Sequence, residues 1–353
     1  MIFLTLIVCF FISILITPIV IKVAYKVGAT DRPNKRKVHQ TLMPRLGGLA
    51  IYISFLVGVL IFQPENQYST SIMIGSGIII ITGIFDDLFE LSAKIKLLAQ
   101  VIAAFVVVLY GGLEITFINL PLGGLFEFGY LSIPLTILWI IGITNAINLI
   151  DGLDGLAAGV SSIALISISG MAIIMGNHYV VAIGSILLVS TLGFLYYNFH
   201  PAKIFMGDTG ALFLGYMIAV LSLLGFKNVT FVSFIVPIII LGVPISDTVF
   251  AIVRRIINKQ PISMPDKSHL HHCLLRLGYT HRQTVLLIYA LATFFGMVAV
   301  IFSQAKLWGA MVLVAILLFL IEIIAERIGL FGKDFHPLLK LIKSIKLSTE
   351  KKG

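Results

Sequence analysis

Charged residues are scarce in this chain. Asp, Glu, Lys and Arg together make up 12% of the 353 residues, whereas apolar residues make up 59% and the mean hydropathy is +1.06. These fractions lie far outside those of ordinary soluble domains. The apolar residues are grouped into runs of about 20, the length that crosses about 30 Å of hydrocarbon as a helix. The composition therefore excludes an ordinary soluble domain and predicts membrane-spanning helices.

Cysteine and targeting signals are also scarce. Only Cys9 and Cys273 are present, far apart in the sequence, so there is no framework of paired cysteines to suggest disulfides. The first apolar run, residues 1–21, has no basic region ahead of it and no small-residue cleavage site behind it. We therefore expect a retained span there and not a cleaved signal peptide.

The apolar runs between glycine, proline and charged breaks predict eleven helices. They lie near residues 2–21, 47–63, 70–85, 96–112, 131–149, 157–176, 179–197, 210–226, 230–253, 284–304 and 307–327. The segment 113–130 is expected to be a loop or a β-hairpin that adds no span. The predicted fold class is an all-α polytopic membrane protein, with residues 1–330 forming a single integral-membrane domain.

The distribution of basic residues predicts the orientation in the membrane. If the N-terminus is outside and the C-terminus is cytoplasmic, all of the 25 Lys and Arg residues except Lys227 and Lys306 fall in cytoplasmic segments. Lys and Arg are retained on the cytoplasmic side, so this orientation is favoured over its reverse. The net charge of +9 is thus mainly a topology signal, and nucleic-acid binding is not expected.

The predicted cytoplasmic tail, residues 331–353, is basic. Lys340, Lys343 and Lys346 alternate with Leu339, Ile342 and Ile345, a pattern typical of a short amphipathic helix on anionic lipid. A solvated basic tail explains the same pattern equally well.

Polar side chains gather at the predicted cytoplasmic ends of the spans. They are Arg45, Asp86, Asp87, Asn148, Asp151, Asp154, Asn198, Asp208, His269, His271 and His272. The predicted outer loops offer only Glu65, Glu114, Glu127 and His178. This asymmetry predicts one polar site at the cytoplasmic face of the bilayer.

Asp86 and Asp87 end the predicted third span, where two adjacent carboxylates are costly unless a cation or water compensates them. Neighbouring helix positions point about 100° apart, so one carboxylate can face a metal or phosphate while the other reaches a second group. Taken alone, the pair is better explained as helix-end carboxylates wetted by the interface.

The segment from Asn148 to Gly155 places Asp151 and Asp154 three residues apart in a short glycine-flanked turn. Both carboxylates could face one ligand, and Asn148 adds a donor and an acceptor suited to a polar heterocycle or a ribose. A helix-capping turn explains one of the two acids but explains the pair less well.

Asp208 precedes the predicted eighth span in the sequence Phe205-Met206-Gly207-Asp208-Thr209-Gly210. A carboxylate near a helix N-terminus, together with a substrate phosphate, is a suitable site for Mg²⁺. An N-capping role for Asp208 is compatible with metal binding.

Three imidazoles occur within four residues at His269, His271 and His272. Zinc is one interpretation, but no second histidine pair follows at metal spacing, so contacts with phosphate are favoured. Asp247, inside the predicted ninth span, is expected either to pair with Arg254 or to serve the substrate.

Taken together and in this order, these motifs resemble those of the polyprenyl-phosphate N-acetylhexosamine-1-phosphate transferases. The markers are Pro44-Arg45-Leu46-Gly47-Gly48, Phe85-Asp86-Asp87, Asn148 to Gly155, Phe205 to Gly210 and His269 to His272. The resemblance runs from about residue 30 to about residue 285 and implies ten or eleven spans, Mg²⁺ dependence (with Mn²⁺ as a substitute) and a cytoplasmic site.

The resemblance also implies roles for individual residues. Asp208 is similar to the metal ligand of the family, and Asp86 and Asp87 to its catalytic carboxylates, which could share the metal. Asn148, Asp151 and Asp154 would bind uridine, and the three histidines would hold the pyrophosphate. Arg45, Lys96, Asn198 and Phe205 match positions of the substrate site, where Lys96 and Asn198 would line the phosphate.

Within the family, the stretch from Asp31 to His39 followed by Pro44-Arg45-Leu46 is similar to that of the UDP-GlcNAc users, and overall similarity is closest to the members that initiate wall teichoic acid synthesis. The implied reaction transfers GlcNAc-1-phosphate from UDP-GlcNAc to undecaprenyl phosphate and releases UMP. UDP-GalNAc as donor and a homodimer both stay open. The chief alternative is a membrane transporter or lipid carrier with intramembrane carboxylates.

Overall fold

The computed structural model describes residues 1–31, 42–119, 124–226, 231–261, 266 and 268–328. The helices are α1 (Ile2–Val27), α2 (Gly47–Phe62), α3 (Ser69–Phe89), α4 (Ala93–Phe105), α5 (Ser132–Ile150), α6 (Leu156–Ile174), α7 (His178–Asn198), α8 (Gly207–Phe226), α9 (Phe231–Ile240), α10 (Gly242–Ile257), α11 (Leu270–Arg276), α12 (His281–Gln304) and α13 (Leu307–Ile328). A π-helical turn, Val106–Tyr110, continues α4, and a 3₁₀ turn, Gly129–Leu131, precedes α5. The predicted tail, residues 331–353, lies outside the described residues.

The described part of the chain is an all-α bundle with nine helices long and apolar enough to cross a membrane. A tenth apolar helix, α2, has 16 residues and is shorter. Together with the long apolar runs of the sequence, these helices make the chain a multi-pass membrane protein. Ten of the predicted helices occur where they were expected, but eleven spans are not confirmed.

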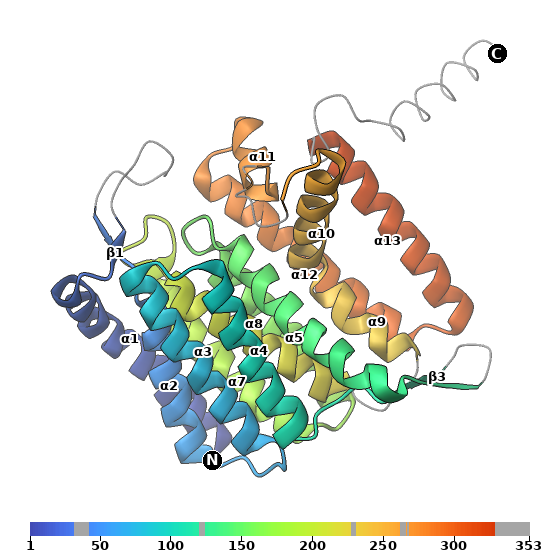
Figure 1. Ribbon diagram of the computed structural model, residues 1–353, viewed down its shortest axis with the longest axis horizontal. Helices are drawn as coiled ribbons and strands as arrows, with labels where there is room; N and C mark the ends of the chain where they lie inside the picture. The colour runs from blue at the N-terminus through green and yellow to red at the C-terminus, as the bar shows by residue number, and fades with distance from the viewer. Residues whose placement is uncertain (32–41, 120–123, 227–230, 262–265, 267, 329–353) are drawn as a thin grey trace.

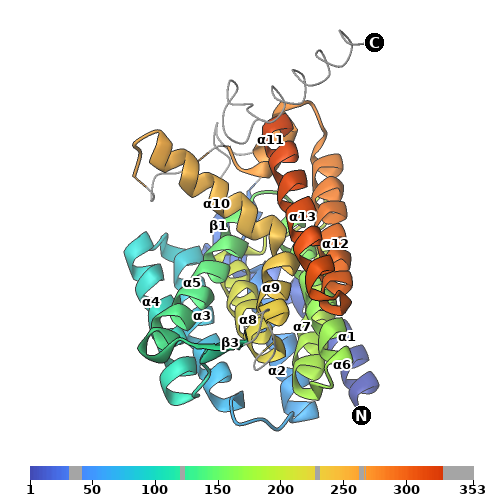
Figure 2. The ribbon, with the colours of Figure 1, turned by 90° about the vertical axis from the view of Figure 1, so that its right-hand side faces the viewer.

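The predicted helix at residues 230–253 is wrong. Two shorter helices, α9 and α10, occupy this stretch and meet at Leu241. Proline lacks the backbone N–H that continues a helix, and Pro237 and Pro244 flank the break. Figure 2 shows α10 leaving the bundle obliquely.

The segment 113–130 contains the expected hairpin. Strand β3 (Phe117–Asn119) pairs antiparallel with β4 (Leu125–Glu127), with Phe117 opposite Glu127. A second small ladder joins β1 (Thr30–Asp31) to β2 (Met43–Pro44) and brings the chain to the start of α2.

Helix α8 forms the centre of the bundle, packed by α2, α3, α5 and α6 (Figure 2). Its side chains from Ala211 to Leu221 are almost fully buried, whereas α1 and α13 expose large apolar side chains such as Phe3 and Trp308. A helix that is apolar all round is stable only when it is enclosed, and exposed apolar faces suit contact with lipid. The start of α8 is therefore held inside the protein.

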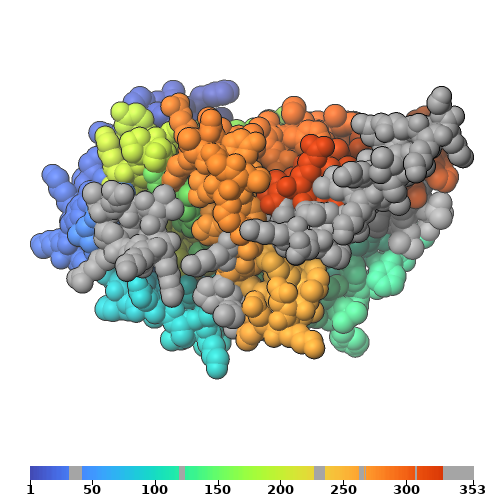
Figure 3. Space-filling model, turned by 90° about the horizontal axis from the view of Figure 1, so that it is seen from above, coloured from blue at the N-terminus to red at the C-terminus, as the bar shows by residue number. Residues whose placement is uncertain are grey.

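The polar motifs lie at one end of the bundle, the upper end in Figure 1, opposite the N-terminus of α1. The ends of α3, α5 and α7 and the starts of α4, α8 and α12 meet there, because successive antiparallel helices return to the same end. Figure 3 looks onto this end, where α11 and the start of α12, in orange, lie near the middle of the face. The predicted convergence on one face is confirmed, while the assignment of this face to the cytoplasm stays a prediction.

Candidate active site

Two glycine-containing motifs, Pro44 to Gly48 and Phe205 to Gly210, are joined by backbone hydrogen bonds beside the site. Phe205 donates its N–H to the carbonyl of Pro44 at 2.8 Å, and Gly47 donates its N–H to the carbonyl of Phe205 at 3.0 Å. A Cβ at Gly48 would lie 2.0 Å from the backbone nitrogen of Gly210. The absence of a side chain at Gly48 lets α2 and α8 touch through their backbones, which fixes the loop that carries Asp208.

Asp87 stabilises the start of α8 from a neighbouring helix. Its Oδ1 accepts the N–H of Asp208 at 3.0 Å, and its Oδ2 accepts the N–H and the hydroxyl of Thr209 at 3.1 and 2.6 Å. The guanidinium of Arg45 donates to Oδ1 at 3.2 Å. Both oxygens of Asp87 are thus engaged, so this carboxylate acts as an N-cap of α8 supplied by α3.

Asp86 and Asp208 face a cation. The Nζ of Lys96 lies 2.8 Å from Oδ2 of Asp208 and 3.4 Å from Oδ2 of Asp86. The three carboxylates of Asp86, Asp87 and Asp208 come within 4.8 Å of one another. Such a concentration of negative charge at 4% exposure for both Asp86 and Asp87 requires compensation, and Lys96 and Arg45 supply it from two sides.

This acid cluster fits a divalent metal ion. The Oδ1 of Asp86 is buried and has no hydrogen-bond partner among the described residues. Mg²⁺ prefers one or two carboxylates together with phosphate oxygens and water, and Asp86 and Asp208 offer that set. An orphaned buried carboxylate oxygen is costly without such a ligand, which is an argument from this structure for a cation at Asp86.

The turn after α5 approaches the acid cluster through Asp151. Burial, followed by the nearby charges of Asp208 and Asp87, raises the pKa of the Asp151 carboxyl to about 8. Asn148, one turn earlier on α5, hydrogen-bonds to Asp208. Asn148 and Asp151 are therefore brought to the acid cluster, and their predicted role in binding uridine stays a prediction.

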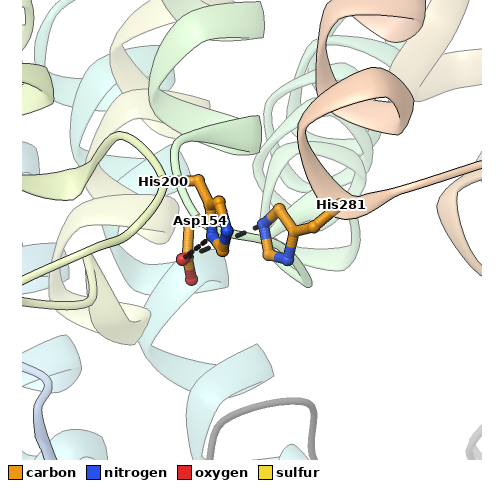
Figure 4. A group of neighbouring side chains, drawn as sticks. All are labelled: Asp154, His200 and His281. Atoms are coloured by element: carbon orange, nitrogen blue, oxygen red, sulfur yellow. Dashed lines mark hydrogen bonds and ion pairs between the residues drawn. The ribbon is translucent and has the colours of Figure 1, made fainter.

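Asp154 points to different partners. Its Oδ2 accepts the N–H of Ala202 at 3.1 Å and lies 2.7 Å from Nδ1 of His200, as Figure 4 shows for the histidine. His281 contributes a second imidazole, with Nε2 3.9 Å from the same oxygen. The expectation that both carboxylates of the turn face one ligand is thus not matched by the geometry, because Asp154 packs against the α7–α8 connection.

Asn198 is buried and holds two loops. Its Oδ1 accepts the N–H of Gly155 at 3.1 Å, and its Nδ2 donates to the carbonyl of Ile204 at 2.9 Å. The amide thereby ties the turn after α5 to the loop before α8. In these contacts Asn198 positions the turn and the loop around the site.

The histidine motif lies over the same turn. A Cβ at Gly152 would lie 2.4 Å from Nε2 of His271, so the imidazole rests on the backbone beside Asp151. Burial, followed by the neighbouring His272, lowers the pKa of His271 to about 3. His272 packs against His271 with ring centroids 4.2 Å apart. His271 is consequently neutral at physiological pH and can offer an N–H donor without a full charge.

Asp247 anchors this motif. Its Oδ2 lies 2.9 Å from Nδ1 of His269, and its Oδ1 accepts the N–H of Leu270 at 2.7 Å. Arg254, the partner suggested by the sequence, makes an ion pair with Asp266, which lies between α10 and α11. Asp247 therefore orients the histidines from α10.

Sequence reasoning missed His200 and His281. His200 is a single histidine in the α7–α8 connection and His281 a single histidine at the start of α12, and no motif spacing relates either to Asp154. Only the folding of three distant segments brings them together (Figure 4). The participation of the Thr209 hydroxyl was also missed, although its place in the motif after Asp208 was a usable signal.

Fold and site together define an integral membrane protein with a charged site at the ends of its helices. The family model of glycosyl transferase family 4 matches residues 69–226, the stretch from α3 to α8 that contains the acid cluster. A probable undecaprenyl-phosphate N-acetylglucosaminyl 1-phosphate transferase from Bacillus subtilis is 51% identical, over 96% of this chain and 97% of that protein.

More distant relatives agree. A decaprenyl-phosphate N-acetylglucosaminephosphotransferase from Mycobacterium leprae is 36% identical over 84% of this chain and 82% of its own length. An undecaprenyl-phosphate alpha-N-acetylglucosaminyl 1-phosphate transferase from Escherichia coli K12 is 29% identical over 85% of this chain and 84% of its own length. The chain belongs to glycosyl transferase family 4, as the resemblance in the sequence indicated.

Proposed function

We propose that this protein transfers GlcNAc-1-phosphate from UDP-GlcNAc to undecaprenyl phosphate. An oxygen of the lipid phosphate attacks the β-phosphorus of the donor, the bond to the bridging oxygen of UMP breaks, and UMP leaves. The products are undecaprenyl diphosphate-GlcNAc and UMP. The printed names of the relatives support the acceptor class and the transferred group.

The observation that carries this proposal is the acid cluster bridged by Lys96. Two phosphate-bearing substrates repel each other, so the reaction needs fixed cations and a metal site close together. Lys96 lies between Asp86 and Asp208, and Arg45 lies against Asp87. A Lys that already bridges two carboxylates at the membrane surface can exchange one of them for a lipid phosphate.

The fit of the acid cluster to a divalent ion supports Mg²⁺ dependence. Asp208 and Asp86 would hold Mg²⁺, whose chemistry there is to offset the charge of the two phosphate groups. Asp87 keeps the start of α8 in place, and through it the carboxylate of Asp208. We therefore assign the direct role to Asp86 and Asp208 and a positioning role to Asp87.

Donor recognition falls to the turn after α5 and the histidine motif. Asn148 and Asp151 would meet the uridine, with Asp154 at the outer end of the turn. His271 and His272 would donate to the pyrophosphate, since His271 rests on Gly152 within the same turn. These roles follow the family resemblance and are compatible with the contacts described above.

The decisive experiment measures UMP release by the purified protein with UDP-GlcNAc, undecaprenyl phosphate and Mg²⁺. We expect lipid-dependent UMP that disappears with EDTA and in Asp208→Asn. UDP-GalNAc in a parallel reaction tests the choice of donor. If the folded wild-type protein releases no UMP from any UDP-N-acetylhexosamine, the transporter alternative is favoured over the transferase.

We further propose that the site faces the cytoplasm and that the lipid product starts a cell-wall polymer, a wall teichoic acid. The basic residues beside the site support the cytoplasmic assignment. Labelling of single cysteines placed at Gln63 and at Lys203 from outside intact cells tests the orientation. Labelling at position 203 alone would mean that the orientation is the reverse of the one proposed.

A further inference from the structure

A second cluster of metal-ligating side chains shares no residue with the acid cluster. Asp154 lies in the turn between α5 and α6, His200 in the connection between α7 and α8, and His281 at the first residue of α12. Their ligand atoms come within 4.8 Å of one another, and Figure 4 shows both imidazoles directed at the carboxylate. Three segments far apart in the sequence therefore converge on one oxygen.

We propose that Asp154, His200 and His281 form a binding site for a zinc-class transition-metal ion. Zn²⁺ binds histidine nitrogen and carboxylate oxygen at about 2.0–2.2 Å, which in tetrahedral geometry separates the ligand atoms by about 3.3 Å. Here His200 Nδ1 lies 2.7 Å and His281 Nε2 lies 3.9 Å from Oδ2 of Asp154. Coordination of one ion requires the first separation to lengthen and the second to shorten, which needs rotation of the two histidine side chains.

The hydrogen bonding of His281 supports an ion at this place. Both ring nitrogens are buried and make no hydrogen bond of normal length and angle in the part of the chain that the structure describes, although His281 keeps a weaker contact with the backbone of Asp154. An unpartnered buried nitrogen is costly, and coordination of a metal by Nε2 would remove half of that cost. The rings of His200 and His281 are stacked with centroids 4.2 Å apart and planes inclined by 19°, so one ring must turn out of the stack before both nitrogens direct their lone pairs at one ion.

The donor set selects the class of metal. Two imidazoles and one carboxylate suit Zn²⁺ and its neighbours among the divalent transition metals, whereas Mg²⁺ prefers the all-oxygen acid cluster. Three protein ligands leave one coordination position for water. The side chain of His200 is 39% exposed, which gives the ion a route of entry.

The ion would fasten the turn that carries Asp151. Through Asp154 it would join this turn to the α7–α8 connection and to α12, elements that hold the opposite sides of the site. Coordination uses Oδ2 of Asp154 and leaves Asn148 and Asp151, the residues proposed to meet the uridine, outside the metal site. The ion is therefore a structural metal ion that holds these elements together, and catalysis does not depend on it directly.

The test measures metal content and not activity, so its outcome is independent of the proposed function. The full-length protein is purified in detergent, stripped with a chelator, equilibrated with Zn²⁺ in the presence of excess Mg²⁺ and freed of unbound metal. Elemental analysis then gives zinc per chain. Equilibration with Co²⁺ in a parallel sample gives a visible spectrum that reports nitrogen ligands and coordination number.

We expect about one zinc per chain in the wild type, an intense tetrahedral Co²⁺ spectrum, and a rise in melting temperature on adding Zn²⁺. His200→Ala and His281→Ala should each lose most of the zinc and the rise. His178→Ala, at the start of α7 and outside the cluster, should behave as the wild type. His272→Ala should also keep the zinc.

Three outcomes would overturn the proposal. One is a wild type without bound zinc, in which case a proton shared by the two imidazoles and Asp154 explains the geometry. The second is equal zinc in the wild type and in a folded His281→Ala variant. The third is loss of zinc in His272→Ala with retention in His281→Ala, which would move the site to the histidine motif of α11.

Discussion

Asp87 and Thr209 are joined by two hydrogen bonds to one carboxylate oxygen, from the backbone N–H at 3.1 Å and from the hydroxyl at 2.6 Å. Asp87 lies in the last turn of α3, and Thr209 lies in the first turn of α8. This contact turns one member of an acidic pair into a support for the other carboxylates. The two adjacent acids, which look alike in the sequence, therefore have different tasks.

Thr209→Val tests that support. It removes the hydroxyl donor and keeps the shape of the side chain, so we expect a loss of about 1–2 kcal/mol in stability and a lower melting temperature. Activity per folded molecule should fall only a few-fold, because the N–H bonds to Asp87 stay. A variant with wild-type stability and no activity would place Thr209 in contact with substrate instead.

Asp86→Asn should show the opposite pattern. The Oδ1 of Asp86 has no partner among the described residues, so removing this charge should leave the melting temperature unchanged or raise it. We expect UMP release to fall by at least about 100-fold, since the variant loses a proposed metal ligand. Measuring both quantities on one preparation separates this pattern from that of Thr209→Val. Comparable activity in the variant and the wild type would contradict the direct role.

Gly48→Ala tests the contact between α2 and α8. The added Cβ would lie 2.0 Å from the nitrogen of Gly210, and backbone cannot move aside cheaply. We expect a loss of about 3 kcal/mol or more, read as poor yield or a sharply lower melting temperature. Gly77→Ala on α3 is the matched control, because its Cβ would come no closer than 3.8 Å to another atom. The control should be neutral or gain up to about 1 kcal/mol from helix propensity.

The lowered pKa of His271 predicts that the stability of the protein depends on pH. Its folded pKa of about 3 lies below that of an unfolded histidine, about 6.5, so the unfolded chain binds the extra proton first on acidification. The contribution of His271 is complete above about pH 6.5 and is lost as the pH falls toward 3, by about 2 kcal/mol at pH 5. Melting temperatures from pH 8 to pH 5 should fall less steeply in His271→Gln. Parallel curves for the two proteins would show that His271 accepts a proton while folded.

Prediction from the sequence succeeded where a local pattern carries the information. Runs of about 20 apolar residues are sufficient to identify a span, because lipid requires an apolar helix that satisfies its own backbone. For residues 230–253 this rule gave the wrong result, because it predicted one helix where the structure has two. Their apolar run is continuous, and the effect of Pro237 and Pro244 depends on whether neighbouring helices can tolerate the unpaired carbonyls.

The sequence could predict which residues gather at the site but not how their side chains are arranged there. Polar residues at alternate helix ends must meet at one face, so the sequence was enough to gather Asp86, Asp151 and Asp208. It could not tell which carboxylates face each other, because that depends on helix rotation and on loop paths. Asp87 turned out to cap α8, and Asn198 to tie two loops.

The sequence by itself determined that this chain is a multi-pass membrane protein of glycosyl transferase family 4, with a polar site at one end of its helices. Composition and motif order are sufficient for that, since both are properties of the chain without reference to distance. Only the tertiary structure decided that Oδ1 of Asp86 has no partner among the described residues, that Lys96 bridges Oδ2 of Asp86 to Asp208, and that His200 and His281 meet Asp154. Those relationships join residues from different helices, and packing alone sets the distances between them.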